Sequence, residues 1–297
     1  MNKATTIPSK PGSLGLLSGS PVKKPLDPSK VILTVVAGLF GIFMVMPLVW
    51  MLSASLKNEL EVFQYPIRWI PETIRWENYR EVWAGLYPFG TFYWNSLKVT
   101  TISVTGLVIT SSLAAYSFAK LDYPGRDKLF LGYLATMMIP PQVLLVPRFI
   151  LFRNFGILNT HWALILPGIF IIFGVFLLRQ FFTTIPNELS ESALIDGASH
   201  FTIWSKIIMP LAKPALVSLI IVSFVWRWND YEEPLVFLNT KELFTIPVAL
   251  TLFVDEFETR YSLIMAATVS AIVPVLAVFL AGQKFFVQGI VTSGLKG

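Results

Sequence analysis

The residue types that carry enzyme chemistry are scarce in this chain of 297 residues, which has no cysteine and only two histidines, His161 and His200. Without cysteine there is no disulfide framework, no thiolate zinc site and no cysteine nucleophile. The sequence also lacks the G-x-x-x-x-G-K-[ST] loop that cradles phosphates, so we expect the chain not to hydrolyse ATP itself. No G-x-S-x-G turn supports a serine nucleophile, and no pair of carboxylates forms a plausible acid–base site. We therefore predict no catalytic residue, no metal site and no cofactor in this chain.

The most ordered polar pattern is typical of protein docking rather than of catalysis. Glu191-Ser192-Ala193 is followed after three residues by Gly197, and after nine more by Ile207-Ile208-Met209-Pro210. Pro186 suits the first position of a helix, where its missing N–H costs nothing. Glu188 and Glu191 then lie in the first turns, which the positive end of the helix dipole favours. Gly197 ends that helix with a positive φ, which other residues adopt reluctantly.

A second short helix is predicted to follow the glycine. Ser199 can cap it, and Phe201, Trp204 and Ile208 fall at i, i+3 and i+7, which makes one apolar stripe. Such a helix can lie in the membrane surface with its stripe towards lipid. We favour docking onto another protein, because a surface-lying helix needs neither the glycine nor the prolines that end this one. The residues predicted to dock are Glu191, Ala193, Gly197, Phe201, Trp204, Ile207 and Pro210.

The composition indicates that lipid surrounds most of the chain. Hydrophobic residues make up 54% of it, charged residues only 14%, and the mean hydropathy is +0.64. A soluble domain carries roughly 25% charged residues. The net charge of +5 is modest, and the aromatic–basic interleaving of single-strand binders is absent, so nucleic acid is not an expected partner.

Six apolar stretches are each long enough to cross about 30 Å of hydrocarbon as a helix. The expected fold class is an all-α membrane protein, because the period-two alternation of barrel strands is absent. Residues 1–30 are rich in proline and lysine and are predicted to form a disordered tail rather than a signal peptide. The predicted spans are 31–54, 96–118, 129–150, 161–181, 214–236 and 262–283.

Lysine and arginine set the expected orientation. They are enriched in the tail and in the short Lys120–Lys128 loop, so both termini and the Glu191 loop are placed in the cytoplasm. The first external loop, about 57–92, holds several aromatic residues that form either an interfacial belt or a surface for an external partner. These aromatic residues are Trp69, Trp76, Trp83 and Tyr87.

The predicted path for a substrate lies in the fifth span. Charged groups inside a span are costly and raise a functional hypothesis, and Arg227 and Asp230 are spaced to pair on one helix. The flat aromatic faces nearby are suited to stacking on sugar rings. The alternative is that the helix reaches the outer interface at Arg227, which leaves these groups, Glu232 and Glu233 in water. The predicted path residues are Trp226, Trp228, Asn229, Asp230 and Tyr231.

The 187–209 segment resembles the signature cytoplasmic motif of ATP-binding-cassette (ABC) importer permeases. Other motifs, spread over about residues 31–297, resemble the MalG-like inner-membrane permease subunits of binding-protein-dependent carbohydrate importers. These motifs are Asn95-Ser96-Leu97, Ser112–Lys120, Tyr123–Arg126, Pro140-Pro141-Gln142, Trp228–Tyr231, Pro234-Leu235, Thr245–Val248, Met265-Ala266-Ala267, and Phe285–Gly289 through the terminal Lys296-Gly297.

The resemblance implies a type I importer permease fold (MetI-like) of six transmembrane helices, 31–297, with cytoplasmic coupling helices. The 187–209 loop would insert into a cleft of an ATPase subunit, with Glu191 near a basic group. Ser192 stands where the family usually has alanine, and Met209 where it has leucine. The tail 288–297 would reach between two ATPase subunits; without the resemblance it is simply a frayed end. Its candidate contacts are Gln288, Gly289, Lys296 and Gly297.

The implied partners are a second, MalF-like permease, two MalK-like ATP-binding subunits that hold ATP and Mg²⁺, and an external solute-binding protein. The implied function is import of an oligosaccharide across the bacterial cytoplasmic (inner) membrane. The sugar stays open, and maltodextrin-like, galactan-derived and alginate fragments all fit. Two alternatives also stay open, a permease for a non-sugar solute and a stand-alone ion-coupled carrier. The carrier usually shows inverted repeats, and this sequence has no clear repeat.

Overall fold

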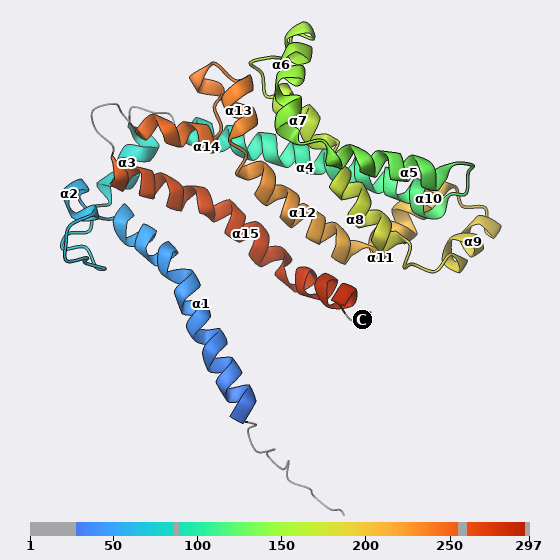
Figure 1. Ribbon diagram of the computed structural model, residues 1–297, viewed down its shortest axis with the longest axis horizontal. Helices are drawn as coiled ribbons and strands as arrows, with labels where there is room; N and C mark the ends of the chain where they lie inside the picture. Colours follow the sequence, from blue (N-terminus) through green and yellow to red (C-terminus); the bar gives the residue numbers. More distant parts are fainter. Residues whose placement is uncertain (1–27, 86–88, 255–259, 295–297) are drawn as a thin grey trace, which may run out of the picture. The chain divides into compact units, whose positions relative to one another are not determined.

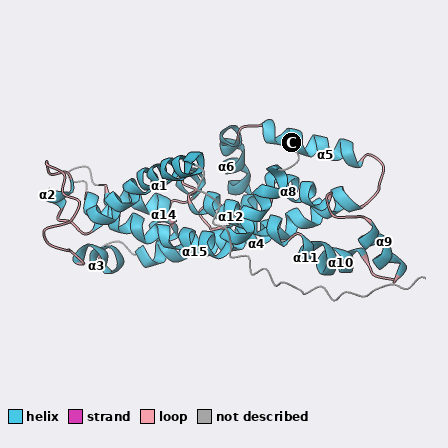
Figure 2. Ribbon diagram, turned by 90° about the horizontal axis from the view of Figure 1, so that it is seen from below, coloured by secondary structure: helices cyan, strands magenta, loops and turns pink. Residues whose placement is uncertain are grey.

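The computed structural model describes residues 28–85, 89–254 and 260–294, with side chains through residue 284. The described chain consists of helices joined by loops, so the predicted all-α class is confirmed (Figures 1 and 2). Residues 1–27, most of the predicted tail, lie outside this description. The chain divides into two compact units, 1–48 and 49–297, and each is taken by itself.

The described part of the first unit is the beginning of α1 (Pro28–Ser55). Its most apolar window has a mean hydropathy of 2.5, and none of that window is buried within the protein. Large apolar side chains such as Leu39 and Phe43 are more than half exposed around the helix. A helix that is apolar on all sides and unpacked is one that lipid solvates.

The second unit is a bundle built on four long helical segments that pack along one another (Figure 1). Helix α4 packs against α7, α8 and α12, and α12 also packs against α15. Close approach is possible because small residues meet at the crossings. A Cβ on Gly174 would lie 2.5 Å from Ser111 Oγ, and one on Gly168 would lie 2.8 Å from Ser103 Oγ. The segments are α4 (Phe89–Lys120), α7 with α8 (Trp162–Ile169, Ile172–Phe182), α12 (Lys213–Trp228) and α15 (Tyr261–Gly294).

One of the six predicted spans, the third, is a bent pair rather than a single helix, and a second bend precedes the fifth span. In the third span, Arg126–Met138 and Pro141–Asn154 meet at 87°. Pro140 and Pro141 explain this break, because proline removes a backbone donor and disfavours helix in the residue before it. The predicted fifth span, 214–236, begins just after the second bend, where His200–Leu211 and Lys213–Trp228 meet at 79°. Among the described residues, four helices are long and apolar enough to span alone, and the count reaches six if each bent pair is one span.

Short helices gather at the two ends of the second unit. Helices α2 and α3 lie at one end, and α9, α10 and α11 lie at the other, near the end of α4 (Figures 1 and 2). The predicted span 214–236 runs past the end of α12 at Trp228 and into α13. The shorter elements are α2 (Glu59–Val62), α3 (Glu77–Ala84), α5 (Arg126–Ala135), η1 (Thr136–Met138), η2 (Pro141–Leu144), α6 (Leu145–Asn154), α9 (Glu188–Ile195), α10 (His200–Ile203), η3 (Trp204–Ile208), α11 (Met209–Leu211), α13 (Glu232–Phe237), η4 (Lys241–Leu243), α14 (Ile246–Ala249) and η5 (Leu250–Phe253).

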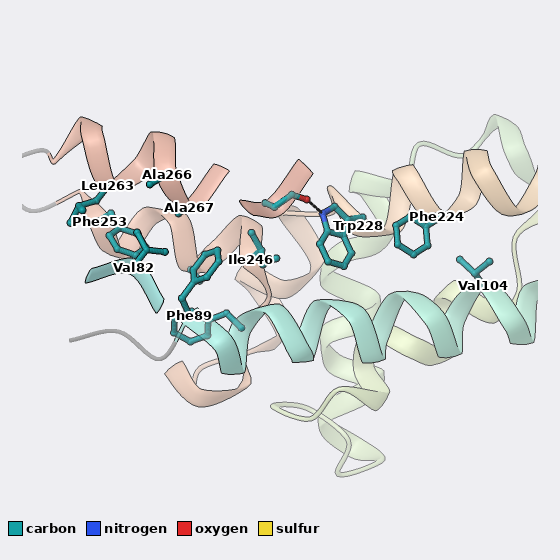
Figure 3. Close-up of a cluster of buried hydrophobic side chains, with 13 residues drawn as sticks. Val82, Phe89, Val104, Phe224, Trp228, Ile246, Phe253, Leu263, Ala266 and Ala267 are labelled. Carbon is teal, nitrogen blue, oxygen red and sulfur yellow. Dashed lines mark hydrogen bonds between the residues drawn. The ribbon is translucent and has the colours of Figure 1, made fainter. Parts of the chain in front are cut away.

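Buried apolar side chains form a separate cluster near each end of the bundle. The first cluster, which we call the loop-end cluster because it lies towards α2 and α3, joins α3, α4, α12, α14 and α15. It includes Phe89, Trp228 and Ile246 (Figure 3). The other cluster lies at the end of the bundle that carries α9–α11, and we call it the elbow-end cluster after the bend between those helices. It comprises Leu107, Ala115, Tyr116, Phe130, Val175, Leu178, Phe182, Ile185, Ile203, Ile208, Ala212, Ala215 and Leu219. The second cluster includes residues from both the membrane helices and the α9–α11 region, so it fixes that region to the bundle.

Candidate coupling site

The α9–α11 region forms a bent structure that we call the elbow, residues 187–211. Its first arm, α9, begins at Glu188 after Asn187, two residues later than the predicted start at Pro186. Glu188 and Glu191 both lie in the first turn of α9 and are exposed. Carboxylates in this position are stabilised by the amide dipoles at a helix N-terminus.

The turn of the elbow is a Schellman motif centred on Gly197. The Ala198 amide donates to the Ala193 carbonyl oxygen at 2.9 Å, and the Gly197 amide donates to the Leu194 carbonyl oxygen at 3.0 Å. These two bonds close the end of α9 in the manner that defines the motif. Gly197 has φ +82°, so the predicted left-handed glycine is confirmed. Nothing lies within 4 Å of where a Cβ would stand, so the backbone conformation rather than space selects glycine.

The second arm begins with a side-chain cap. Ser199 Oγ accepts a hydrogen bond from the Thr202 amide at 3.3 Å, which confirms the predicted capping serine. Helix α10 is only four residues long and continues directly into η3, a π-helix over Trp204–Ile208. Turns of this type are rare and often lie at functional sites.

The π-turn changes which side chains of the second arm face inward. Ile203 and Ile208, five residues apart, are both fully buried, whereas Phe201 is 67% exposed. The predicted stripe of Phe201, Trp204 and Ile208 assumed a regular 3.6-residue period and is wrong for Phe201. Ile203 was missed for the same reason, since only the wider π-turn brings it into register with Ile208.

The elbow therefore has an inner and an outer face, and the predicted docking residues divide between them. Ala193, Trp204 and Ile207 are partly buried against the elbow-end cluster. On the outer side Glu191, Gly197, Phe201 and Pro210 are exposed. Leu194 and Ile195, which the sequence did not single out, are 43% and 87% exposed there. An exposed apolar surface beside a carboxylate is suited to receiving a protein partner.

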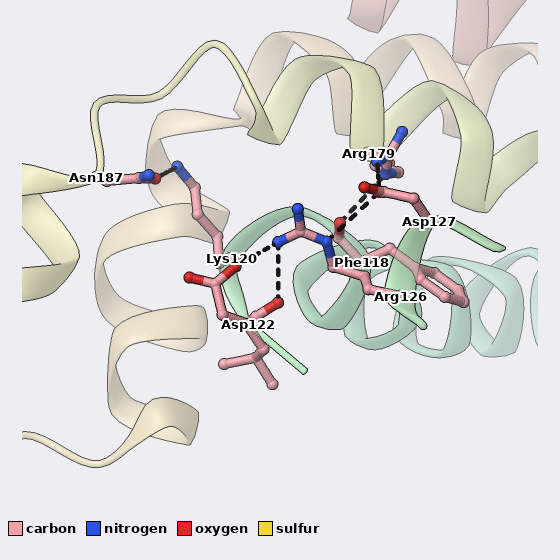
Figure 4. Close-up of polar contacts among 8 residues, drawn as sticks. Phe118, Lys120, Asp122, Arg126, Asp127, Arg179 and Asn187 are labelled. Atoms are coloured by element: carbon pink, nitrogen blue, oxygen red, sulfur yellow. Dashed lines mark hydrogen bonds and ion pairs between the residues drawn. The ribbon is translucent and has the colours of Figure 1, made fainter. Parts of the chain in front are cut away.

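Polar contacts hold the elbow and the neighbouring loops to the membrane helices (Figure 4). Lys120 Nζ, at the end of α4, donates to Asn187 Oδ1 at 2.8 Å and to the Ile185 carbonyl oxygen at 2.5 Å. On α8, Arg179 donates to Asp127 at 3.0 Å and to the Phe118 carbonyl oxygen at 3.2 Å. The sequence reading missed these contacts, although the basic residues that end both helices were visible in it.

The predicted substrate path does not form a single aromatic surface. Trp228 is 3% exposed, stacks on Phe224 and donates its indole N–H to the Ala271 carbonyl oxygen at 3.0 Å (Figure 3). Trp226 is half exposed and packs against Phe173. Trp228 is therefore part of the helix packing and is unavailable to a ligand in this conformation.

The other three path residues lie where α12 ends. Asn229 is exposed and donates to the Val225 carbonyl oxygen, and Tyr231 is 40% exposed. Asp230 is partly buried and accepts from Arg227 at 2.7 Å, so the predicted i, i+3 pair is confirmed. Trp226 and these residues do not share one flat face with Trp228.

Arg227 belongs to a larger group of ion pairs than the sequence indicated. Its guanidinium contacts Asp230 at 2.7 Å and Glu233 at 2.8 Å, and Glu233 also accepts from Arg148 at 2.5 Å. The four side chains are between 11% and 22% exposed. Arg148 reaches Glu233 because the break at Pro140 turns α6 towards α13. The group links α6 to the end of α12.

A small polar cavity of about 10 Å³ lies beside this group, between α4 and the end of α12. It is lined by Arg227, Asp230 and Thr245, among others, and Thr245 Oγ1 is buried without a hydrogen-bond partner. A space of this size holds about one water molecule and no sugar ring. Within the described ranges, no group of three or more His, Asp or Glu side chains could hold a metal ion.

The 57–92 loop, which was predicted to be external, is anchored at the end of the second unit opposite the elbow (Figure 1). Glu59 accepts hydrogen bonds from the Tyr261 and Ser262 amides, so it caps α15. Lys57 is buried, lies over the Trp50 ring and donates to the Arg68 carbonyl oxygen. Burial lowers the pKa of Lys57, and the Glu61 carboxylate partly offsets this.

The aromatic residues predicted for this loop are mostly exposed. Trp76 is 66% exposed, and Trp69 and Trp83 are just under half exposed. Tyr87 lies outside the described residues. At the other terminus, Gln288 and Gly289 lie within α15, which continues to Gly294, while Lys296 and Gly297 lie outside the described residues.

The bundle and its elbow define a helical membrane transport subunit, and comparison with known proteins names its family. Residues 108–292 match the family of binding-protein-dependent transport system inner membrane components, and the chain belongs to this family. A permease for arabinooligosaccharides from Halalkalibacterium halodurans is 32% identical over 270 residues, 90% of this chain and 96% of the relative. A permease for sulfoquinovosyl glycerol from Agrobacterium fabrum is 33% identical, over 99% of this chain and 100% of the relative.

A solved structure supports the fold. A bacterial ABC transporter involved in the import of the acidic polysaccharide alginate matches 90% of this chain and 100% of its own, with a TM-score of 0.78 and 26% identity. The chain is thus a multi-pass inner-membrane permease of a binding-protein-dependent ABC importer. It is a transport subunit rather than an enzyme, and ATPase partners carry the nucleotide.

Proposed function

We propose that this chain is one of two permease subunits of an ABC importer that moves an oligosaccharide across the cytoplasmic membrane. The other subunits are a second, MalF-like permease and two MalK-like ATPase subunits, together with a solute-binding protein outside the membrane. Both chain termini and the elbow lie in the cytoplasm in this proposal, as the enrichment of Lys and Arg indicates.

The observation that carries the proposal is the elbow itself. Two short helices meet at a Schellman turn, one face is packed on the protein's own core, and the other presents Glu191 with exposed Ile195 and Phe201. Glu191 and Ile195 lie four residues apart on α9 and share one face of that helix, which supports a protein partner for this surface. We assign that partner as an ATPase subunit, with the tail after Gln288 as a second contact.

The energy for transport then comes from the partner's nucleotide cycle. This chain supplies a bundle with two or more arrangements, and the ATPase must bind those arrangements with different affinity. The bend at Pro140 within the third span and the bend before Lys213, between the elbow and α12, are the described features best suited to changing angle.

An oligosaccharide is the favoured cargo because of the relatives. Besides the arabinooligosaccharide permease, a permease for melibiose, raffinose and stachyose from Bacillus subtilis is 33% identical over 90% of this chain. For contact with sugar we retain Trp226, Asn229 and Tyr231, which are exposed, and Asp230, which lies beside the small cavity. Trp228 leaves this set in the conformation described.

A second candidate cargo is a small anionic solute. A permease for sn-glycerol-3-phosphate from Pectobacterium atrosepticum is 32% identical over 89% of this chain, close to the identity of the sugar permeases. The ion pairs of Arg227 and Arg148 with Glu233 speak against this cargo, since each guanidinium already has a carboxylate partner. An ion-coupled carrier has no support, because the family is one that works with a binding protein.

Purification and reconstitution test the proposal. The tagged chain, expressed with the permease, ATPase and binding-protein genes that accompany it, is expected to copurify with an ATP-binding subunit. In proteoliposomes, loaded binding protein is expected to stimulate ATP hydrolysis. A purified chain that never retains an ATP-binding subunit, under detergents that keep it folded, would refute the proposal. Competition between neutral oligosaccharides and sn-glycerol-3-phosphate for the binding protein distinguishes the two cargoes.

A further inference from the structure

The two arms of the elbow are held by side chains that lie one turn apart on α4. Lys120 binds the entry to the first arm through Asn187 Oδ1 and the Ile185 carbonyl oxygen, at 2.8 and 2.5 Å. Tyr116 lies 3.1 Å, from its hydroxyl to Nδ1, from His200, the first residue of the second arm. Positions i and i+4 share one face of a helix, so a single face of α4 contacts the elbow on both sides of Gly197.

These two contacts differ from the apolar packing around them. Ile203 and Ile208 are buried in the elbow-end cluster, and this packing holds the elbow near the bundle. Apolar contacts are non-directional and allow small sliding movements. Hydrogen bonds depend on angle and distance, and a bond from a charged amine is the stronger kind. The polar contacts therefore fix the orientation of the elbow relative to α4.

Because of the position of α4, its polar contacts with the elbow can transmit movement to the other membrane helices. Helix α4 packs against α7, α8 and α12, and so touches both the fourth span and the straight part of the fifth. A rotation of the elbow that α4 follows is passed directly to the centre of the bundle. The route through the chain itself is less direct, because the backbone bends by 79° between the second arm and α12.

We propose that Tyr116 and Lys120 are positioning residues for energy coupling, which make the elbow and the end of α4 move as one body. This inference rests on the proposed function. It adds that the conformational change of the ATPase is transmitted to the membrane helices through α4. Tyr116 is 5% exposed and Lys120 lies between the bundle and the elbow, so neither residue needs to contact the ATPase.

Removal of the two polar groups tests the proposal in the reconstituted complete transporter. Tyr116→Phe keeps the ring and removes the hydroxyl, and Lys120→Met keeps the length and removes the amine. The double variant is expected to copurify with its ATPase and to hydrolyse ATP, with a roughly fivefold to tenfold fall in solute imported per ATP. This fall is a lower bound, because the double variant loses the neutral Tyr116–His200 hydrogen bond and both charge-assisted bonds that Lys120 donates. Lys120→Arg keeps a donor and should restore most of the coupling.

Matched controls come from the adjoining loop. Tyr123→Phe and Lys128→Met make the same chemical changes in the loop after α4, at residues that form no hydrogen bond or ion pair with the described elbow, and should couple like the wild type. A double variant that assembles and couples normally would overturn the inference and leave the proposed function standing. A wild-type chain that retains no ATPase would overturn the proposed function itself.

A distance measurement keeps the test decisive if the double variant assembles poorly. The chain has no cysteine, so spin labels can be placed at Ser117→Cys on α4 and Lys206→Cys on the second arm without other reactive sites. The label distance is expected to stay constant between the nucleotide-free and ATP-bound transporter while the ATPase subunits close. A distance that changes with nucleotide in the otherwise unaltered chain would show that the two elements move independently, and would refute the inference.

Discussion

Replacement of Gly197 tests the turn of the elbow on purely conformational grounds. The residue has φ +82°, and a Cβ there would meet nothing within 4 Å, so an added side chain is strained by the backbone and not by a clash. The left-handed conformation costs an ordinary residue about 1–2 kcal/mol, and a β-branched one more. Gly197→Val should therefore reduce the population of the bent elbow by roughly tenfold or more, while Gly197→Asn, which tolerates this region, should lose much less.

The assay is ATP hydrolysis by the reconstituted transporter with and without loaded binding protein, together with the amount of ATPase subunit retained. Gly197→Val is expected to lower both the retention and the stimulation, with Gly197→Asn between it and the wild type. Gly132 supplies a control, because it also has open space at its Cβ position but lies in α5 without a positive φ. Wild-type coupling in Gly197→Val would refute the reasoning. A loss in Gly197→Asn as large as in Gly197→Val would show that close approach to a partner, not φ, selects glycine.

Three further predictions concern the elbow and the bundle. Ser199→Ala removes the cap on the Thr202 amide and should cost about 1 kcal/mol of local stability, measured as faster amide exchange in the second arm; unchanged exchange would contradict the cap. Arg227→Met leaves Asp230 without an ion-pair partner and Glu233 with Arg148 alone, and should destabilise the detergent-solubilised protein by about 3 kcal/mol, read as a lower Tm, whereas Glu232→Gln, which changes an exposed carboxylate, should not. Trp228→Phe should lower the Tm without altering the preference among solutes, and a changed preference would return Trp228 to the substrate path.

The features of the elbow that were predicted correctly from the sequence are those that depend on local backbone conformation and capping. Gly197 and Ser199 act through their own backbone and immediate neighbours, so residue type and spacing were sufficient to predict a positive φ and a cap. The register of the second arm was not predictable in this way. The π-turn that buries both Ile203 and Ile208 depends on packing against the elbow-end cluster. A pattern based on the regular 3.6-residue helical period carries no information about that packing.

In the bundle, too, features set by local sequence were predicted, and features set by tertiary packing were not. Apolar length predicted the spans, and the family resemblance is confirmed, but span boundaries of 129–150 do not give the 87° angle that the helix takes at Pro140 and Pro141. Arg148 pairs with Glu233 only because that break redirects α6, and no local rule connects two residues so far apart. Trp228 was assigned to a ligand from its chemistry, yet its place among Phe224 and the α15 backbone is a matter of helix packing.

The central claim, that the outer face of the elbow receives an ATPase subunit, is tested most directly by photo-cross-linking from Ile195. This side chain is 87% exposed beside the Gly197 turn, and Ile70, 82% exposed in the loop between α2 and α3, provides a control position. A photoreactive residue at position 195 in the assembled transporter is predicted to form a covalent product with the ATP-binding subunit, and one at position 70 is predicted not to. Cross-linking of position 195 to lipid or to the external binding protein alone, in a transporter that remains active, would contradict the account.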